Sequence, residues 1–236
     1  MALILCIETG TDICSVGLVN NGELISLRES DSGRDHAKKV ALFVDELLTE
    51  NDIAPEQIDA VAVGEGPGSY TGLRIGVSFA KGLCYGTGKP LIAISSLAAL
   101  TAVACQDYDA GIIDVENWDK VRLCPMIDAR RMEVYTQIFT SEGVAQGEVK
   151  AEIVSEDSFA EWRSKGNFVI FGNGAAKCQE VLADAKYINI VPSARGLVPL
   201  AEQKLAEGKV EDIAYFEPFY LKNFVATKSK DLLKNP

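Results

Sequence analysis

This 236-residue chain is organised around Gly64-Glu65-Gly66-Pro67-Gly68-Ser69-Tyr70-Thr71-Gly72-Leu73-Arg74. The stretch follows an apolar run at residues 60–63, which is typical of a buried strand, and leads into a helical pattern at residues 73–85. Glycine adopts positive φ angles and lets another backbone or a ligand come close, so a strand, a glycine loop and a helix in this order mark a candidate site. The loop can serve either as a phosphate-binding loop or as a tightly packed turn.

The composition is that of a globular protein with an acidic surface. The chain carries 23 basic and 34 acidic residues, and its formal net charge of −11 would repel a polyanion over most of the surface. We therefore expect any nucleic acid to be held by a partner and not by this chain alone. No apolar run approaches the about 18 residues of a membrane span. The six cysteines show no Cys-x-x-Cys spacing, which favours reduced thiols in a cytoplasmic protein.

The predicted elements repeat in outline along the chain. The first half contains three strands, a helix, a strand, the glycine loop with its helix, and a last strand with its helix; these elements lie at residues 3–7, 14–19, 23–28, 36–49, 60–63, 73–85, 91–94 and 96–105. The second half repeats this order at residues 121–127, 134–139, 144–153, 155–164, 168–171, 175–183, 187–191 and 197–207. Ser155 is expected to cap the first helix of this half, and a second glycine loop lies at residues 172–174.

A polar segment without periodicity, residues 106–120, separates the two halves. We therefore expect an N-terminal lobe at residues 1–105 and a C-terminal lobe at residues 106–236, the latter with a basic C-terminal tail. Two α/β lobes, each with a mixed sheet covered by helices, describe the duplicated ribonuclease-H-like fold of actin-like ATPases and sugar kinases. In that fold the paired loops face a shared cleft. The basic residues of the tail are Lys222, Lys228, Lys230 and Lys234.

The sequence contains few of the motifs that known catalytic sites require. A P-loop requires Gly-x-x-x-x-Gly-Lys-[Ser/Thr], and neither residues 66–73 nor residues 86–90 supply it. The single histidine, His36, lies at the start of a predicted helix, where we expect an exposed or capping residue and not a metal ligand. A serine triad would need the same histidine and a Gly-x-Ser-x-Gly elbow, which the sequence lacks. No catalytic residue is assigned.

Three acidic residues keep phosphotransfer open as an alternative. Asp12 lies in the first strand turn and either holds a magnesium-bound water or satisfies the turn with its side chain. Glu65, beside the glycine loop, is equally ambiguous. Asp128 ends a predicted strand, where it either faces a cleft or pairs with an arginine of the following turn. A free-standing, nucleotide-binding phosphotransferase of the actin-like fold is therefore the first rival function.

Four segments resemble the bacterial TsaB (YeaZ) family. They are Leu5-Cys6-Ile7-Glu8-Thr9 with Cys14-Ser15-Val16, Gly66-Pro67-Gly68-Ser69-Tyr70-Thr71-Gly72-Leu73-Arg74-Ile75-Gly76, Ile127-Asp128-Ala129-Arg130-Arg131-Met132-Glu133-Val134-Tyr135, and Glu217-Pro218-Phe219-Tyr220-Leu221-Lys222. They are spread from Leu5 to Lys222, nearly the whole length of the chain, and the glycine segment together with Ile-Asp-Ala-Arg is highly specific. The resemblance implies a non-catalytic scaffold subunit of the complex that forms N6-threonylcarbamoyladenosine at position 37 of ANN-decoding tRNAs.

The resemblance also implies the partners, which are the paralogous catalytic subunit TsaD and the ATPase TsaE. It implies that tRNA is reached indirectly through the complex, that no cofactor binds this chain alone, and that any ATP and magnesium belong to the complex. TsaD carries His-x-x-x-His on the helix after its glycine loop, whereas Ser96 and Leu100 stand at the matching positions here. A leucine cannot ligate a metal, so no metal site is expected. An M22 glycoprotease-like metalloenzyme is therefore the weaker rival function.

The first two long helices supply the predicted partner interface. Gly72, Gly76, Ala80 and Cys84 recur at intervals of four residues and form a small-residue ridge, which lets another element approach the backbone closely. Without the partner, the same surface would pair two copies of the chain in a self-complementary homodimer. The expected interface residues are Leu42, Phe43, Ile75, Gly76 and Phe79.

Without a P-loop lysine or metal ligands, the glycine loop is better explained as a joint than as an active site. Tight turns at Gly66 and Gly68 would deliver the ridged helix to a neighbouring helix, including one of another subunit. Proximity to a nucleotide remains the alternative. The loop residues concerned are Gly66, Gly68, Ser69, Thr71 and Gly72.

Overall fold

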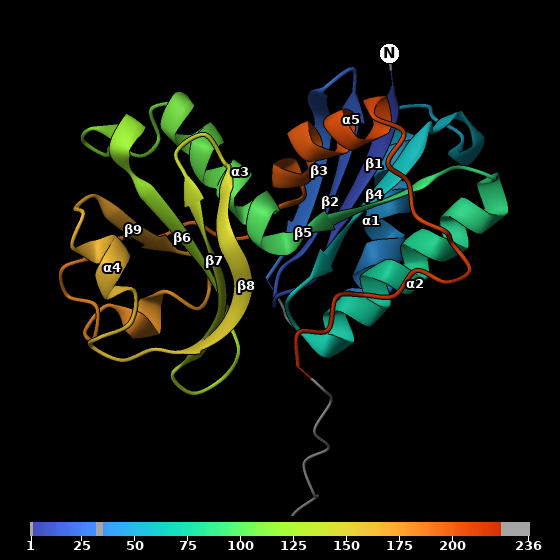
Figure 1. The fold of residues 1–236 in the computed structure, drawn as a ribbon. Helices are drawn as coiled ribbons and strands as arrows, with labels where there is room; N and C mark the ends of the chain where they lie inside the picture. Colours follow the sequence, from blue (N-terminus) through green and yellow to red (C-terminus); the bar gives the residue numbers. More distant parts are fainter. Residues whose placement is uncertain (1, 32–34, 223–236) are drawn as a thin grey trace, which may run out of the picture.

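The computed structural model describes residues 2–31 and 35–222, which form two lobes, each built on a five-stranded sheet (Figure 1). The first sheet has the order β3-β2-β1-β4-β5. In this sheet β1, β4 and β5 are parallel, and Asn21 and Gly22, both with positive φ angles, turn the chain between the antiparallel strands β2 and β3. The strands are β1 (Leu3–Glu8), β2 (Cys14–Asn20), β3 (Glu23–Ser30), β4 (Ala60–Gly66) and β5 (Leu91–Ser95).

The second sheet repeats the topology of the first. Its order is β10-β9-β6-β7-β8, so β6 pairs antiparallel with β7 and parallel with β9, as β1 pairs with β2 and β4. The topology confirms the predicted duplicated α/β fold. The strands are β6 (Arg122–Asp128), β7 (Glu133–Thr140), β8 (Ala145–Ile153), β9 (Phe168–Phe171) and β10 (Lys186–Ile188).

Helices cover the sheets of both lobes. The α-helices are α1 (His36–Glu50), α2 (Tyr70–Thr87), α3 (Ser96–Asp109), α4 (Ala160–Arg163) and α5 (Val198–Ala206). Short 3-10 turns form η1 (Pro55–Gln57), η2 (Trp118–Lys120), η3 (Ala176–Cys178) and η4 (Ala194–Leu197). In the described part of the chain, no helix combines the length and the apolar character that crossing a bilayer requires.

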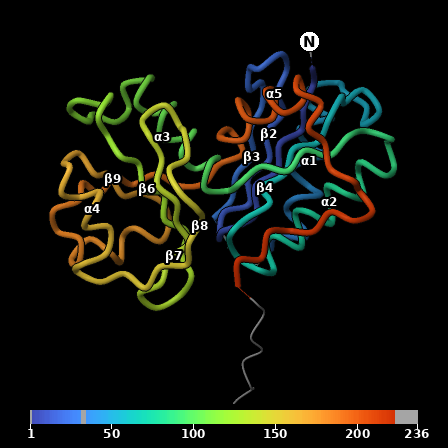
Figure 2. Tube along the Cα trace, in the orientation of Figure 1, coloured from blue at the N-terminus to red at the C-terminus, as the bar shows by residue number. Residues whose placement is uncertain are grey.

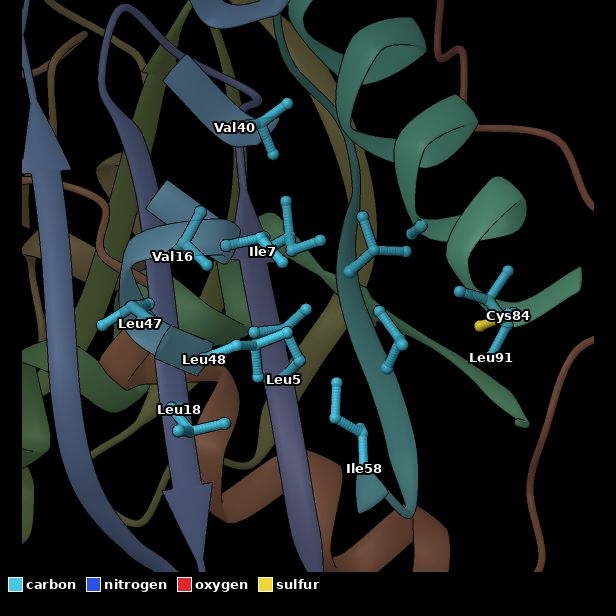
Figure 3. Packing of buried hydrophobic residues seen from close by; sticks show 14 of the residues in the cluster. Leu5, Ile7, Val16, Leu18, Val40, Leu47, Leu48, Ile58, Cys84 and Leu91 are labelled. Atoms are coloured by element: carbon cyan, nitrogen blue, oxygen red, sulfur yellow. The ribbon is translucent and has the colours of Figure 1, made fainter. Parts of the chain in front are cut away.

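The first sheet is covered on both faces, which explains the continuous apolar run of β1. Leu5 and Ile7 point to the face covered by α1 and α2 and pack in the core drawn in Figure 3. Ile4 and Cys6 alternate to the opposite face, where they pack against η4 and α5. A strand that is buried on both faces needs no alternation of polar and apolar residues.

The lobes exchange helices. Leu97 and Leu100 of α3, which follows the first sheet in the chain, pack in one core with Leu123 and Phe139 of the second sheet. In return, η4 and α5, which follow the second sheet, complete the core of the first sheet (Figure 2). The division of the chain at residues 105 and 106 remains a proposal, because these helices cross between the sheets.

The segment at residues 155–164 contains only the short helix α4, so the longer predicted helix is wrong. Ser155 caps no helix; its backbone N–H donates to Ser158 Oγ at 3.1 Å, and that hydroxyl donates to Glu152 Oε1 at 2.9 Å. Side-chain hydrogen bonds of this kind compete with the helical ladder and favour turns.

The helix predicted at residues 175–183 is also wrong, because the segment forms η3 and turns. Cys178 N donates to Ala175 O at 2.9 Å, which closes a tighter turn than an α-helix allows. Lys177 Nζ donates to Glu133 O at 2.7 Å on the neighbouring strand. Tertiary contacts of this kind override a weak helical preference.

Candidate functional site

A cleft of about 410 Å³ lies between the two lobes. In the described part of the chain, five segments line it: the turn after β1, the glycine loop, the turn after β6, the loop after β9, and residues 219–222. We call residues 217–222 the C-terminal strap. The polar and charged lining residues are Thr11, Asp12, Ser69, Tyr70, Thr71, Asp128, Arg130, Tyr135, Asn173, Tyr220 and Lys222. The paired glycine loops therefore face one cleft, as the duplicated fold predicts.

The glycine loop packs directly on the turn after β1. Ser69 N donates to Gly10 O at 2.7 Å, and Ser69 Oγ accepts from Gly72 N at 3.3 Å as the N-cap of α2. A Cβ atom on Gly68 would lie 2.2 Å from Gly10 O, and one on Gly72 would lie 2.1 Å from Thr9 O. No side chain fits at either position, so this backbone contact requires glycine. Ser69 and Thr71 line the cleft, whereas Gly72 lies buried beneath it.

The small-residue ridge of α2 faces the interior of its own lobe. A Cβ atom on Gly76 would lie 2.2 Å from Thr9 Oγ1, and this hydroxyl donates to Gly72 O at 2.9 Å. Ala80 and Cys84 are also buried. At Gly72 and Gly76 the ridge therefore receives the turn after β1, and Ala80 and Cys84 pack in a core that includes Val40 and Val44 of the neighbouring helix α1. Because all four ridge residues are buried within the lobe, the alternative that the ridge meets a helix of another subunit is wrong. Gly76 lies inside the lobe and contributes no surface.

A buried carboxylate, Glu8, ends β1 just before the turn that lines the cleft. Its Oε1 accepts from Gly10 N at 2.7 Å and its Oε2 from Ser96 Oγ at 2.9 Å. Burial raises the pKa of Glu8, and the hydrogen bonds oppose that rise. A Cβ atom on Gly64 would lie 2.2 Å from Glu8 Oε2, so the first glycine of the loop makes room for this carboxylate. The sequence interpretation assigned Glu8 no role, although an acid ending an apolar strand was a visible signal.

The three acidic residues considered for phosphotransfer have different environments. Asp12 is exposed and lines the cleft. Asp128 lines the cleft as well; it forms an ion pair with Lys177, and its carboxylate accepts from Arg130 N at 3.3 Å. Glu65 is half-buried, and this burial raises its pKa. Over residues 2–31 and 35–222, no three His, Cys, Asp or Glu residues are grouped closely enough to hold a metal ion.

His36 is buried, and the expectation of an exposed or capping residue is wrong. Its Nε2 lies 2.9 Å from Thr11 O, so the imidazole binds the turn after β1. A buried ring nitrogen needs a hydrogen-bonding partner, and the carbonyl supplies it. The single histidine thus ties the start of α1 to the wall of the cleft.

Ser96 and Leu100, the two positions at which the sequence resemblance led us to expect no metal ligands, are both buried on α3. Ser95 Oγ caps this helix by accepting from Ala98 N at 3.4 Å, which turns Ser96 inward to Glu8. Leu100 packs against Gly172 of the second glycine loop, where a Cβ atom would lie 2.8 Å from Leu100 Cδ2. Both side chains serve packing between elements that are distant in the sequence.

The C-terminal strap closes one side of the cleft and runs beside α2 in Figure 1. Phe219 N donates to Glu65 O at 2.8 Å, and Lys222 forms an ion pair with Glu133 of the second lobe. The sequence interpretation used this segment for its family resemblance and counted Lys222 in the basic tail, but assigned the segment no place at a cleft. Its position at the cleft depends on contacts with Glu65 and Glu133, which are distant in the sequence. Lys228, Lys230 and Lys234 of the predicted basic tail lie outside the described residues.

A second hollow, of about 600 Å³, forms a groove between α1 and α2. Ile75 and Phe79 of the predicted interface line it, together with Val40. Leu42 is 44% exposed on α1 but does not line the groove, and Phe43 is partly buried against the core. The lining residues are Ala37, Val40, Tyr70, Thr71, Arg74, Ile75, Ser78 and Phe79.

Comparison with known proteins assigns this architecture to a family. A family model described as "TsaD: tRNA N6-adenosine threonylcarbamoyltransferase" matches residues 30–230. The tRNA threonylcarbamoyladenosine biosynthesis protein TsaB of Escherichia coli (strain K12) is 34% identical, over 95% of this chain and 96% of that protein. This chain belongs to the TsaB family.

Two further TsaB (YeaZ) proteins support the same assignment. The TsaB protein of Haemophilus influenzae is 31% identical over 95% of each chain. The solved structure of YeaZ from Pseudomonas aeruginosa superposes with a TM-score of 0.75 at 28% identity, covering 94% of this chain and all of that one. The TsaB resemblance expected from the four sequence segments is confirmed.

Proposed function

We propose that this TsaB-family chain is a non-catalytic scaffold subunit in the biosynthesis of N6-threonylcarbamoyladenosine in tRNA, acting in the cytoplasm. The TsaB relatives carry this pathway in their names. The chain would bind a TsaD-like catalytic subunit and support a TsaE-like ATPase, while tRNA is reached through the complex.

This proposal rests on the burial of Ser96 and Leu100 within the protein. A catalytic metal site needs ligands that converge on one open position. Here the Ser96 hydroxyl is committed to Glu8, and Leu100 is packed between the lobes. Both side chains have become part of the core. A paralogue in this condition retains the fold without the metal chemistry.

The groove between α1 and α2 is the surface proposed for the catalytic partner. It is open on the surface of the first lobe and is lined by Val40, Ile75 and Phe79. Apolar side chains at the centre of a groove serve as anchors for a partner. Leu42 and Phe43 extend the proposed surface along α1, and two copies of the chain would pair here when no partner is present. The acidic balance of −11 leaves tRNA binding mainly to the partner.

Reconstitution tests the proposal. The chain, the catalytic subunit, the ATPase and unmodified tRNA are mixed with the substrates, and modified adenosine is measured by nucleoside mass spectrometry. We expect modification with all proteins present and a loss on omitting this chain. A mixture that contains the Ser96→Ala variant should still modify the tRNA, whereas substitution of a catalytic residue would abolish the modification. Full modification without this chain would overturn the proposal.

The interlobe cleft gives the rival phosphotransferase its supporting observation, because Asp12 and Asp128 both line it. Asp128, however, is already paired with Lys177. Titration calorimetry of the isolated chain with Mg-ATP separates the two functions. We expect no heat of binding for a scaffold subunit, and micromolar binding would favour the phosphotransferase.

A further inference from the structure

The interlobe cleft and the groove between α1 and α2 share a wall. Tyr70 and Thr71, in the first turn of α2, line both hollows. Arg74 lines only the groove, and Tyr220 of the strap lines only the cleft. A residue in a shared wall contacts whatever occupies either hollow, so Tyr70 is placed to connect them.

Tyr70 contacts residues of both hollows. Its ring centroid lies 4.8 Å from that of Tyr220, with an interplanar angle of 35°. Arg74 Cζ lies 5.3 Å from the centroid of the Tyr70 ring, and Arg74 Nη1 lies 3.4 Å from its hydroxyl. Aromatic and cation–π contacts both depend on ring orientation. A change in the position of the Tyr70 ring therefore alters its contact with Tyr220.

The strap that carries Tyr220 is attached to both lobes. Phe219 N donates to Glu65 O at 2.8 Å in the first lobe, and Lys222 pairs with Glu133 in the second. Lys222 is 43% exposed, and ion pairs on a surface contribute little stability. The backbone bond of Phe219 and the ring contact of Tyr220 attach the strap independently of this ion pair.

We propose that a partner filling the groove holds the C-terminal strap closed over the cleft, with Tyr70 as the link. This inference rests on the proposed function, which supplies the occupant: a catalytic subunit that places apolar side chains against Ile75 and Phe79. The occupant adds contacts to Tyr70 and Arg74 and restricts the ring that packs on Tyr220. The strap then opens less often in the assembled chain than in the free chain.

Amide hydrogen exchange of the full chain tests this coupling, because the Phe219 N–H is exposed to solvent when its bond to Glu65 opens. Saturation with the catalytic subunit should slow exchange at Phe219 by about tenfold. The amide of Glu211 is the internal control. It donates to Leu91 O at 2.8 Å outside the strap, and its exchange should not change. Unchanged exchange at Phe219 in a saturated complex would overturn the coupling and leave the scaffold function standing.

Two tyrosine variants distinguish coupling from direct burial of the strap by the partner. Tyr220→Ala removes the ring that contacts Tyr70; it should bind the partner as the wild type does but lose the slowing at Phe219. Tyr215→Ala removes a tyrosine that is 84% exposed outside the strap, and the slowing should persist. Slowing that survives in Tyr220→Ala, or loss of partner binding in this variant, would overturn the coupling. A catalytic subunit that fails to bind even the wild type would overturn both proposals.

Discussion

Ser96 Oγ donates a hydrogen bond of 2.9 Å to Glu8 Oε2, and the two residues are 88 positions apart in the sequence. Glu8 ends β1, and Ser96 begins α3. The bond therefore joins the first strand turn to the helix that crosses to the second lobe. Because Gly10 N occupies the other carboxylate oxygen, donors from this chain satisfy both oxygens of Glu8.

Substituting Ser96 by alanine should destabilise the fold by about 1 to 3 kcal/mol, because one buried carboxylate oxygen would lose its donor. Urea unfolding followed by circular dichroism measures this change. Ser164→Ala is the matched control, because Ser164 is exposed and should cost less than about 0.5 kcal/mol. Equal effects of the two substitutions would show that the bond to Glu8 adds nothing to stability.

Glu8→Gln should change the pH dependence of stability. Burial raises the pKa of Glu8 in the folded chain, so the folded state holds this proton more tightly than the unfolded state. The resulting stabilisation is fully present below the unfolded pKa of about 4.3 and is lost as the pH rises through the folded value. As the pH rises above about 4.3, the free energy of unfolding of the wild type should therefore fall relative to that of Glu8→Gln. The exposed substitution Glu142→Gln should show no such trend, and parallel curves for Glu8→Gln and the wild type would contradict the prediction.

Substituting alanine for two glycines of α2 should change the stability of the fold in opposite directions. A Cβ atom on Gly72 would lie 2.1 Å from Thr9 O, so Gly72→Ala forces backbone apart and should cost about 1 to 3 kcal/mol or more. Gly82 has no atom within 4 Å of such a Cβ, and Gly82→Ala should stabilise by about 1 kcal/mol through helix propensity. Thermal unfolding of both variants checks the pair, and the same sign for both would refute the assigned contact.

Phe79→Asp should abolish co-purification with the catalytic subunit and keep the fold. Phe79 is partly buried in the groove wall, and a carboxylate there would be desolvated by a partner. Tyr85→Asp places the same charge on the same helix, at a residue that is 86% exposed and outside the groove. Pull-down with the tagged catalytic subunit and circular dichroism of each variant measure the outcome. Retained binding by Phe79→Asp would exclude this groove as the interface.

The cysteines should resist alkylation in the native chain. Burial raises the pKa of Cys6 and Cys124 to about 12 and that of Cys105 to about 11, so little reactive thiolate forms near neutral pH. Cys105 is half-buried and should react first with iodoacetamide at about pH 8, with the other thiols following only on unfolding. Peptide mass spectrometry after timed alkylation gives the order. Rapid labelling of Cys6 would show that the first sheet opens readily.

The strands and their duplication were predictable because each half carries apolar runs that only a buried sheet accommodates. The helices of the second lobe were less predictable. Residues 175–183 have a helical pattern, but Lys177 reaches across to Glu133 and the segment forms turns. Periodicity describes one segment at a time and contains no information about such contacts.

The candidate site was predictable where the chemistry is local, as at Ser69, which caps α2 within the glycine loop. It was not predictable where partners are distant in the sequence. Glu8 acquires its role from Ser96 and from the space left by Gly64, and the strap acquires its role from Glu65 and Glu133. These relationships exist only once the two sheets have been brought together.

The exchange of helices between the lobes limits how this chain can be shortened during evolution. Among residues 2–31 and 35–222, those that line the groove between α1 and α2 all belong to the first lobe, so the described part of the second lobe adds nothing to that surface directly. Yet α5, which completes the first core, can be reached along the chain only through the second sheet. A chain cut off before that sheet would also lack α5, and Ile4 and Cys6 would lose their cover. A protein with this fold therefore cannot lose its second half without also losing part of the core of its first half.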